Sequence, residues 1–504
     1  MFKTLTLILA ASALATAEII SPRTRPVACE SLSVNLPYGA RLLNLTATER
    51  YNVTYGDIPA SVDICDVEIY LTHRDAGDVV RTAIWLPLDK EKWNGRFQGT
   101  GGGGYSTGYF DSQLLPPVAL GYAAGSTDGG VGEDGDPPYW HRDQQLIENF
   151  VHLSIHEMTV MGKEITELFY GIPPAYSYWY GCSTGGRQGL REVQSYPDDY
   201  DGVFVGAPAT NWTELLTAMF WPVVAQKSLA EPLNDCQLNF ITDASVAACD
   251  ELDGAADGII GNPLECNYDP AVLVGVEYPC DEDSRTVTEE DAAVWAGIRD
   301  GLHDANGKRL FYGLREGANY TELSVKPSFD PPRQWIADFL LDDEDADLDR
   351  IGLGGLVELF YKAEAEFGDL WGTTDADISA FKERGGKIIT WHGWADQCIA
   401  PENTIDYWGR VVDEFGDKKE VDDFYRVFLV PGLSHCYGGP GPQPDLFDTI
   451  SPLVEWVEAG KVPDTLLFDS GDGPSRNICK YPEHTKYKGS GDVTKAENWE
   501  CVSS

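Results

Sequence analysis

The sequence predicts an α/β fold in which a parallel sheet is interrupted by a long insertion. Short apolar runs typical of strands alternate with helical patterns up to about residue 207, and the alternation resumes at about residue 376. The segment between these points is irregular and rich in Trp, Asp and Pro. A chain of 504 residues can bury a large core and still carry such a segment. We therefore expect a core built from residues 18–207 and 376–504, with an inserted lid domain over residues 208–375.

The individual elements follow from apolar periodicity and from the turn residues that bound each run. Strands are expected at residues 62–71, 79–86, 96–98, 120–124, 175–180, 202–207, 387–391 and 425–430. Helices are expected at residues 142–169, 187–196, 378–384 and 446–459, and from residue 402 onward. In the first of these helices, Met158, Met161, Ile165 and Leu168 recur at the spacing of a core-facing stripe.

Charge and hydrophobicity restrict the possible partners. The formal net charge is −44, which argues against nucleic acid and anionic membranes as partners. It suits a soluble protein in mildly acidic surroundings or one that binds Ca²⁺. Oligomeric state is not readable from the sequence, and a monomer and a homodimer both remain open.

The N-terminus has the pattern of a secretory signal peptide. Lys3 precedes an apolar run from Leu5 to Leu14, and Ala15-Thr16-Ala17 forms a small-residue cleavage site. We expect residues 1–17 to be removed and the mature protein to be extracellular, with no membrane span. Sequons for N-glycosylation occur at Asn44, Asn52, Asn211 and Asn319. The eleven cysteines, all after this segment, should mostly be paired in an oxidising compartment, with one left over.

A candidate nucleophile lies in Gly181-Cys182-Ser183-Thr184-Gly185, which matches G-x-S-x-G. An apolar aromatic strand precedes the motif and a helical stretch follows it, so Ser183 is expected on a sharp strand-to-helix turn. The N–H of Thr184 would then face a developing oxyanion. A second donor is expected from the glycine run after residue 100, at Gly103. A simple turn and a flexible glycine loop are the alternative interpretations.

The partners of this serine are expected at the ends of two later strands. Asp396 follows the strand at residues 387–391, and His435 follows the strand at residues 425–430. The order Ser, Asp, His is that of α/β-hydrolases. His435 would act as general base, and Asp396 would orient its imidazole and stabilise the charged form. His392 is the one serious competitor among eight histidines, and we expect it to pack beside the site.

Cysteines flank both catalytic candidates, because Cys182 precedes Ser183 and Cys436 follows His435. If these two are bridged, the bond joins the serine turn to the histidine loop and fixes their separation. In the chain-entropy model a loop of about 250 residues corresponds to several kcal/mol of stabilisation.

With these motifs in place, the chain resembles the tannase and feruloyl esterase family of secreted serine esterases. The resemblance rests on the Cys182-Ser183 motif, on His392-Gly393 followed by Asp396, and on Gly432 through Cys436. It implies an α/β-hydrolase core with a lid, a Cys182–Cys436 disulfide, and hydrolysis of aromatic carboxylic esters through an acyl-enzyme. It also implies the pairs Cys29–Cys65, Cys249–Cys266 and Cys479–Cys501, and leaves Cys236, Cys280 and Cys398 unassigned.

An acidic, glycine-containing loop follows Cys249, and its oxygen donors suit a hard cation such as Ca²⁺. A solvated acidic turn is the alternative interpretation. By the resemblance, the ligands are the side chains of Asp250, Asp253 and Asp257 and the carbonyls of Ala255 and Ile259. The metal is expected to be structural, because nothing in the sequence places it near Ser183.

Substrate identity is less defined. Aromatic residues of the insertion could stack on an aromatic acyl group, although more of them are expected in its core: Trp212, Phe220, Trp221, Trp295, Tyr312, Tyr320, Trp335, Phe339, Phe360, Tyr361 and Trp371. The resemblance favours feruloyl esters of plant cell-wall polysaccharides, with a tannase or another small aromatic ester hydrolase close behind. A serine peptidase and a non-catalytic calcium-binding module are the alternatives from other classes.

Overall fold

The computed structural model describes residues 26–503 except 133–136, 138, 281–282, 325–329, 446, 470 and 472. The signal peptide expected at residues 1–17 lies outside the described residues. No helix of the described part is both long and apolar enough to cross a bilayer.

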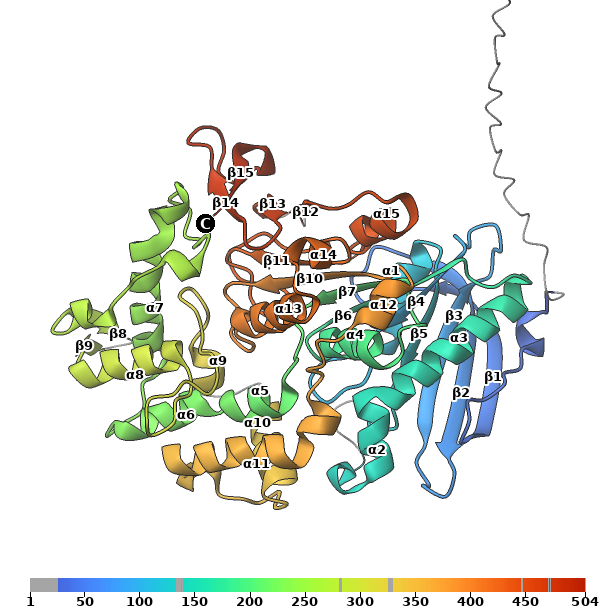
Figure 1. Cartoon of the computed structure of the whole chain (residues 1–504), viewed down its shortest axis with the longest axis horizontal. Coiled ribbons are helices and arrows are strands. Elements are labelled where there is room, and N and C mark those ends of the chain that lie inside the picture. The colour runs from blue at the N-terminus through green and yellow to red at the C-terminus, as the bar shows by residue number, and fades with distance from the viewer. Residues whose placement is uncertain are drawn as a thin grey trace, which may run out of the picture.

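A nine-stranded mixed sheet forms the centre of the molecule (Figure 1). In spatial order its strands are β1 (Ala40–Val53), β2 (Val62–His73), β3 (Val80–Pro87), β5 (Ala123–Thr127), β4 (Arg96–Thr100), β6 (Tyr176–Cys182), β7 (Gly202–Gly206), β10 (Lys387–Gly393) and β11 (Tyr425–Val430). The neighbouring strands β5, β4, β6, β7, β10 and β11 run parallel to one another. The pairs β1–β2, β2–β3 and β3–β5 are antiparallel. The carboxyl ends of β6, β10 and β11 therefore meet at one edge, where sites of parallel sheets lie.

Helices cover both faces of this sheet. The described core helices are α1 (Phe110–Ala119), α2 (Gln144–Glu148), α3 (Ser154–Tyr170), α4 (Thr184–Ser195), α12 (Ser379–Glu383), α13 (Pro401–Phe415), α14 (Lys418–Asp422) and α15 (Ser451–Ala459). On one face α3, α4 and α13 pack on the strands through residues such as Met158, Leu190 and Tyr407. On the other face α1 and α15 pack through Leu114 and Leu453. Apolar burial on both faces explains the continuous apolar runs of the parallel strands.

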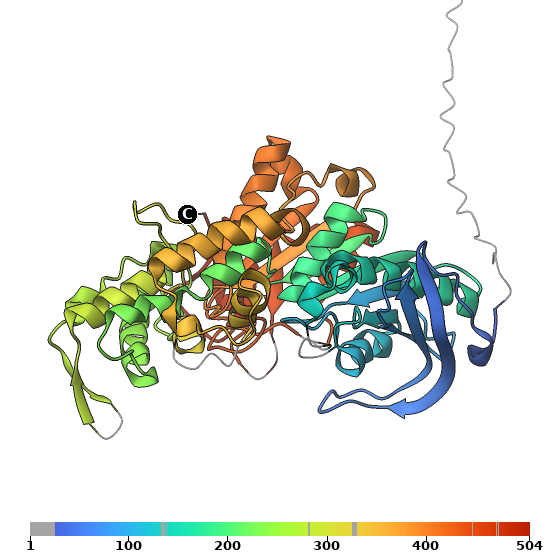
Figure 2. The same ribbon diagram turned by 90° about the horizontal axis from the view of Figure 1, so that it is seen from below.

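The insertion contributes no described strand to the central sheet and lies to one side of it (Figure 2). Its helices are α5 (Trp212–Ala218), α6 (Trp221–Ala225), α7 (Asp235–Cys249), α8 (Glu289–Asp300), α9 (Thr321–Ser324), α10 (Pro331–Gln334) and α11 (Leu353–Trp371), and its hairpin is β8 (Glu277–Cys280) with β9 (Asp283–Thr286). Two apolar clusters hold it together, one around Trp335 and Trp371 and one around Trp295.

The C-terminal segment adds two small sheets to the core. They consist of β12 (Thr465–Phe468) with β13 (Arg476–Cys479), and β14 (His484–Tyr487) with β15 (Trp499–Val502). The bridges Cys29–Cys65, Cys182–Cys436, Cys249–Cys266 and Cys479–Cys501 are all present. The structure also pairs Cys236 with Cys280 and leaves Cys398 as a buried free thiol.

Several sequence-based expectations differ from the structure. The sheet is mixed rather than parallel, and β1 and the four C-terminal strands were not predicted. Strand β1 is an edge strand with mostly exposed side chains, so its residues lack the alternation of a half-buried strand. Helix α15 begins at Ser451, later than the expected start at residue 446.

The four predicted N-glycosylation sites differ in their exposure. Asn44, Asn52 and Asn319 are exposed, but Asn211 is buried with only 7% of its surface accessible. Its side-chain Nδ2 donates to Asn403 Oδ1 at 2.7 Å, and its Oδ1 accepts from Arg410 at 3.0 Å. A glycan cannot occupy that position in this fold, so the expectation for Asn211 is wrong.

Candidate active site

Ser183 lies at the turn between β6 and α4, with φ 61° and ψ −122°. This strained backbone is maintained by close packing of the small residues around it. A Cβ on Gly181 would come within 2.6 Å of the Gly185 carbonyl, and one on Gly186 within 2.6 Å of the Gly206 carbonyl. Gly181 and Gly186 are therefore required sterically, and the turn presents the serine hydroxyl at the carboxyl edge of the sheet.

The structure brings the three catalytic candidates into one hydrogen-bonded series. His435 Nε2 lies 2.9 Å from Ser183 Oγ, and His435 Nδ1 lies 2.7 Å from Asp396 Oδ2. Ser183 is 8% exposed and Asp396 is fully buried. This arrangement allows a proton to pass from the serine hydroxyl to the imidazole while the carboxylate stabilises the resulting charge.

Asp396 is held as an anion by its surroundings. Its Oδ1 accepts hydrogen bonds from the backbone N–H groups of Cys398 and Ile399, each at 2.8 Å. Burial alone raises the pKa of Asp396, but the charge of His435 and the hydrogen bonds of His392 and His435 hold that pKa well below its usual range. The carboxylate therefore stays ionised when His435 gains a proton.

His392 lies beside the site, as expected, and it has a defined contact there. Its Nε2 lies 3.0 Å from Asp396 Oδ2, and its Nδ1 lies 2.8 Å from Thr404 Oγ1. His392 is completely buried, and its ring nitrogens pair with Thr404, Asp396 and the Ile399 carbonyl. It is a positioning residue for the carboxylate.

A disulfide joins the two halves of the site. Cys182 and Cys436 are bonded with their Cα atoms 6.0 Å apart, across 254 residues of sequence. The residues on either side of the bond are Ser183 and His435, so the link lies directly behind the reacting atoms.

The two expected oxyanion donors differ in the structure. The Gly103 N–H donates to the Ser106 carbonyl at 3.1 Å and is thus engaged within its own loop. Thr184 is the first residue of α4, and its side-chain Oγ1 donates to the Gly104 carbonyl. This bond ties the serine turn to the glycine loop, whose residues Gly101 to Gly104 all line the catalytic cavity.

The cavity above Ser183 has a volume of about 990 Å³, ample for an aromatic ester. Its aromatic lining consists of Tyr105, Tyr109, Tyr180 and Tyr437. The insertion contributes Glu322 and Asp330 together with Pro331 and Gln334.

None of the insertion aromatics proposed as a clamp lines this cavity. Trp335 and Phe339 pack edge-to-face against Trp371, which also contacts Trp212 at a tilted angle. These rings belong to a buried apolar cluster that the insertion shares with core residues such as Trp140 and Phe150. The pattern of aromatic residues could not distinguish core from cavity. Tyr105 and Tyr109 could have been found from their position directly after the glycine run.

The acidic loop after Cys249 folds around Asp250. Asp250 Oδ1 accepts hydrogen bonds from the N–H groups of Asp257, Gly258 and Ile259 at 3.0 to 3.2 Å. Burial, together with the nearby Asp257, raises the pKa of Asp253 to about 7. The oxygen donors suit Ca²⁺ by type. In the described structure, however, the three carboxylates do not all approach within 4.8 Å of one another, and Asp257 pairs with Arg476 at 2.6 Å.

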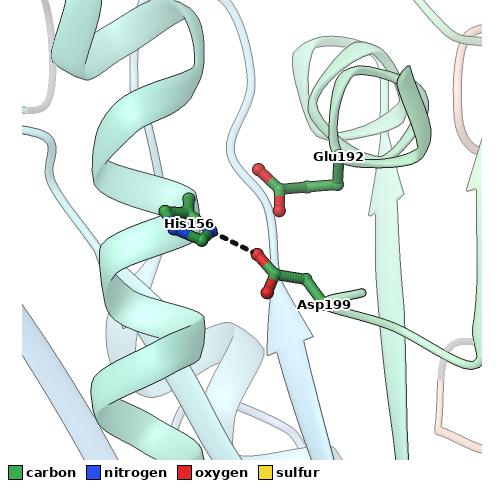
Figure 3. Close-up of side chains that lie close together, drawn as sticks. All are labelled: His156, Glu192 and Asp199. Atoms are coloured by element: carbon green, nitrogen blue, oxygen red, sulfur yellow. Dashed lines mark hydrogen bonds and ion pairs between the residues drawn. The ribbon is translucent and has the colours of Figure 1, made fainter. Parts of the chain in front are cut away.

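A second polar cluster lies beneath α4, away from the catalytic residues. His156, Glu192 and Asp199 approach from α3, α4 and the loop before β7, and His156 Nδ1 lies 2.6 Å from Asp199 (Figure 3). Lys163 donates to the Asp199 carbonyl. Burial and the neighbouring Asp199 raise the pKa of Glu192 well above its usual range. The cluster joins α3 to the helix that carries the nucleophile.

An elbow serine, a histidine and a buried carboxylate in hydrogen-bonding order, at the carboxyl edge of this sheet, define the class of α/β-hydrolases. The model of the family described as "Tannase and feruloyl esterase" matches residues 67–502. The chain therefore belongs to the tannase and feruloyl esterase family and is a carboxylic ester hydrolase.

Individual relatives agree over nearly the whole length. A probable feruloyl esterase of Arthroderma benhamiae is 38% identical over 503 residues, covering 94% of this chain and 93% of that protein. Among solved structures, tannin acyl hydrolase from Aspergillus niger is 27% identical with a TM-score of 0.83, covering 93% of both chains. Feruloyl esterase B from Aspergillus oryzae is 27% identical with a TM-score of 0.81, covering 94% of this chain and 99% of that one.

Proposed function

We propose that this protein is a secreted serine esterase that cleaves feruloyl and related hydroxycinnamoyl esters of plant cell-wall polysaccharides. The observation that carries the proposal is the hydrogen-bonded series Ser183, His435 and Asp396. His435 Nε2 lies 2.9 Å from Ser183 Oγ and its Nδ1 lies 2.7 Å from Asp396 Oδ2, next to a cavity large enough for an aromatic acyl group. The 38% identity to a probable feruloyl esterase supports the acyl group. The similarity to tannin acyl hydrolase supports galloyl esters as the second candidate.

The mechanism follows from the geometry. Ser183 Oγ attacks the ester carbonyl while His435 Nε2 takes its proton, and the tetrahedral intermediate expels the alcohol, which receives that proton from His435. Water then attacks the acyl-enzyme, with His435 again accepting a proton, and returns the acid and free Ser183. Asp396 keeps the imidazole in the required tautomer and stabilises its charged form.

The developing oxyanion requires donors near the Ser183 turn. We propose the Thr184 N–H as one donor, because it begins α4 directly after the nucleophile. The second donor comes from the glycine loop. If Gly103 supplies it, its N–H must be released from, or shared with, the Ser106 carbonyl that it contacts at 3.1 Å.

The five disulfides and the apolar N-terminal segment support secretion. We also propose a structural Ca²⁺ bound by Asp250, Asp253 and Asp257 with the carbonyls of Ala255 and Ile259. Calcium binding would draw the carboxylates together and neutralise charge that burial makes costly.

The test is hydrolysis of methyl ferulate, methyl caffeate, methyl sinapate and methyl gallate by the purified protein and by Ser183→Ala. We expect hydroxycinnamates to be cleaved with higher kcat/KM than methyl gallate. Ser183→Ala should lower kcat by at least about 10⁴-fold without changing the thermal unfolding temperature. Turnover retained by Ser183→Ala would refute the nucleophile, and a preference for methyl gallate would reassign the substrate to galloyl esters.

A further inference from the structure

The acidic loop of the insertion packs directly against the loop that carries His435. Ile259 is 4% exposed, and a Cβ on Gly432 would lie 2.9 Å from Ile259 Cγ2. Gly432 has φ +62°, and such a Cβ would also lie 3.1 Å from Gly441 N. At Gly432 the histidine loop therefore lies close to this isoleucine and to its own return segment at Gly441.

The same loop reaches the carboxylate side of the site. Gly258 and Ile259 share the wall of a cavity of about 420 Å³ with Trp394, Ala395 and Gly432. Trp394 and Ala395 immediately precede Asp396. The insertion thus borders both catalytic loops at the side away from the substrate cavity.

These two catalytic loops are locked to each other, so a displacement of one moves the other. The Ala395 N–H donates to the Leu433 carbonyl at 3.0 Å, and the His435 N–H donates to Gln397 Oε1 at 3.0 Å. A Cβ on Gly393 would come within 2.1 Å of the Leu433 carbonyl oxygen. The two loops are packed too closely at this junction for one backbone to move without the other.

The acidic loop is itself attached to the core and to the insertion. Arg476, which is 1% exposed, pairs with Asp257 at 2.6 Å and stacks over the Trp499 ring at 3.4 Å. The Cys249–Cys266 bridge closes the loop from the insertion side. Because the acidic loop is attached at both ends, the Ile259 side chain has a defined position against Gly432.

We propose that Ile259 is a positioning residue for catalysis: its side chain holds Gly432, and through Gly432 it sets the distance of His435 from Ser183. The insertion is then a brace of the catalytic loops as well as a wall of the substrate cavity. The effect on turnover rests on the proposed function, whereas the effect on the mobility of the histidine loop does not.

The test compares Ile259→Ala with Ile260→Ala. Ile260 is the next residue, is equally buried and lines the same cavity, but its side chain packs in the insertion's own cluster with Trp295 and Leu238, and the side chain beside Gly432 is that of Ile259. We expect Ile259→Ala to lower kcat on methyl ferulate about tenfold or more with KM within about twofold, because a small misplacement of a catalytic group is costly. Ile260→Ala should lose similar thermal stability yet keep kcat within about twofold.

Two further measurements separate positioning from general destabilisation. Amide hydrogen exchange of residues 431–441 should be faster in Ile259→Ala and unchanged in Ile260→Ala. Ile259→Val, which keeps the Cγ2 methyl group, should restore kcat and also serves if the alanine variant does not fold. Equal kcat losses in Ile259→Ala and Ile260→Ala, or unchanged kcat and exchange in Ile259→Ala, would overturn the proposal. If the wild-type protein cleaved no ester, the proposed function would fail. The hydrogen-exchange experiment would still show whether Ile259 restrains the histidine loop.

Discussion

Removing the Cys182–Cys436 bond should affect stability and catalysis by different amounts, and the structure allows both to be worked out. The bond spans 254 residues, for which the chain-entropy model gives about 5.5 kcal/mol of the free energy of unfolding. The Cys236–Cys280 bond spans 44 residues and gives about 4 kcal/mol in the same model. The double variants Cys182→Ser with Cys436→Ser, and Cys236→Ser with Cys280→Ser, are therefore predicted to differ in stability by only about 1.5 kcal/mol.

Their kinetics should differ far more. Loss of the first bond frees the chain on either side of the 2.9 Å contact between His435 and Ser183, so kcat should fall about 100-fold. Loss of the second bond, in the insertion, should leave kcat within about twofold. The assays are denaturant unfolding and steady-state hydrolysis of methyl ferulate. If the first variant kept wild-type kcat, or if both variants lost kcat equally, the geometric role assigned to this bond would be incorrect.

Two further outcomes are expected. His73 is buried against Asp78 at 2.6 Å and Glu157 at 3.1 Å, and although burial lowers its pKa, these partners raise that pKa to about 9. Because the folded-state pKa exceeds the ordinary value of about 6.5, protonated His73 stabilises the fold. Its contribution to the free energy of unfolding is complete below pH 6.5 and is lost as pH rises through 9, by at most about 3 kcal/mol. The stability difference between wild type and His73→Asn should shrink over that interval, and a constant difference would contradict the assignment. For calcium, EGTA should lower the unfolding temperature by several degrees and Ca²⁺ should restore it, whereas Asp250→Asn should abolish this response. An unfolding temperature indifferent to EGTA, with no binding heat on Ca²⁺ titration, would remove the metal from the proposal.

Local signals made much of the site predictable. The strand, tight glycine turn and helix around Ser183 are contiguous, and the geometry of the turn depends on residues within a few positions of it. Asp396 and His435 became candidates for a similar reason, because each lies a few residues past an apolar run with the pattern of a strand. The core helix stripe through Met158 and Met161 was likewise correct, since both side chains are fully buried.

Features that depend on contacts distant in sequence could not be found in this way. His73 has the sequence context of a surface residue, but Glu157, 84 residues later, covers it in the interior. Asn211 forms a valid sequon, yet its amide is bonded to Asn403, 192 residues away.

The sequence alone identified Ser183, Asp396 and His435 as the candidate triad, because covalent order and short-range sterics predict a nucleophile turn and two strand ends, and the structure places these three side chains within hydrogen-bonding distance. Only the tertiary structure decided what surrounds that triad. It showed that Tyr105 and Tyr109 line the cavity, that Trp212 and Trp371 pack in a buried cluster shared with the core, and that Ile259 lies beside Gly432. An aromatic or aliphatic side chain has the same apolar character in a core, in a cavity wall or at a domain contact, and only packing in three dimensions separates these cases.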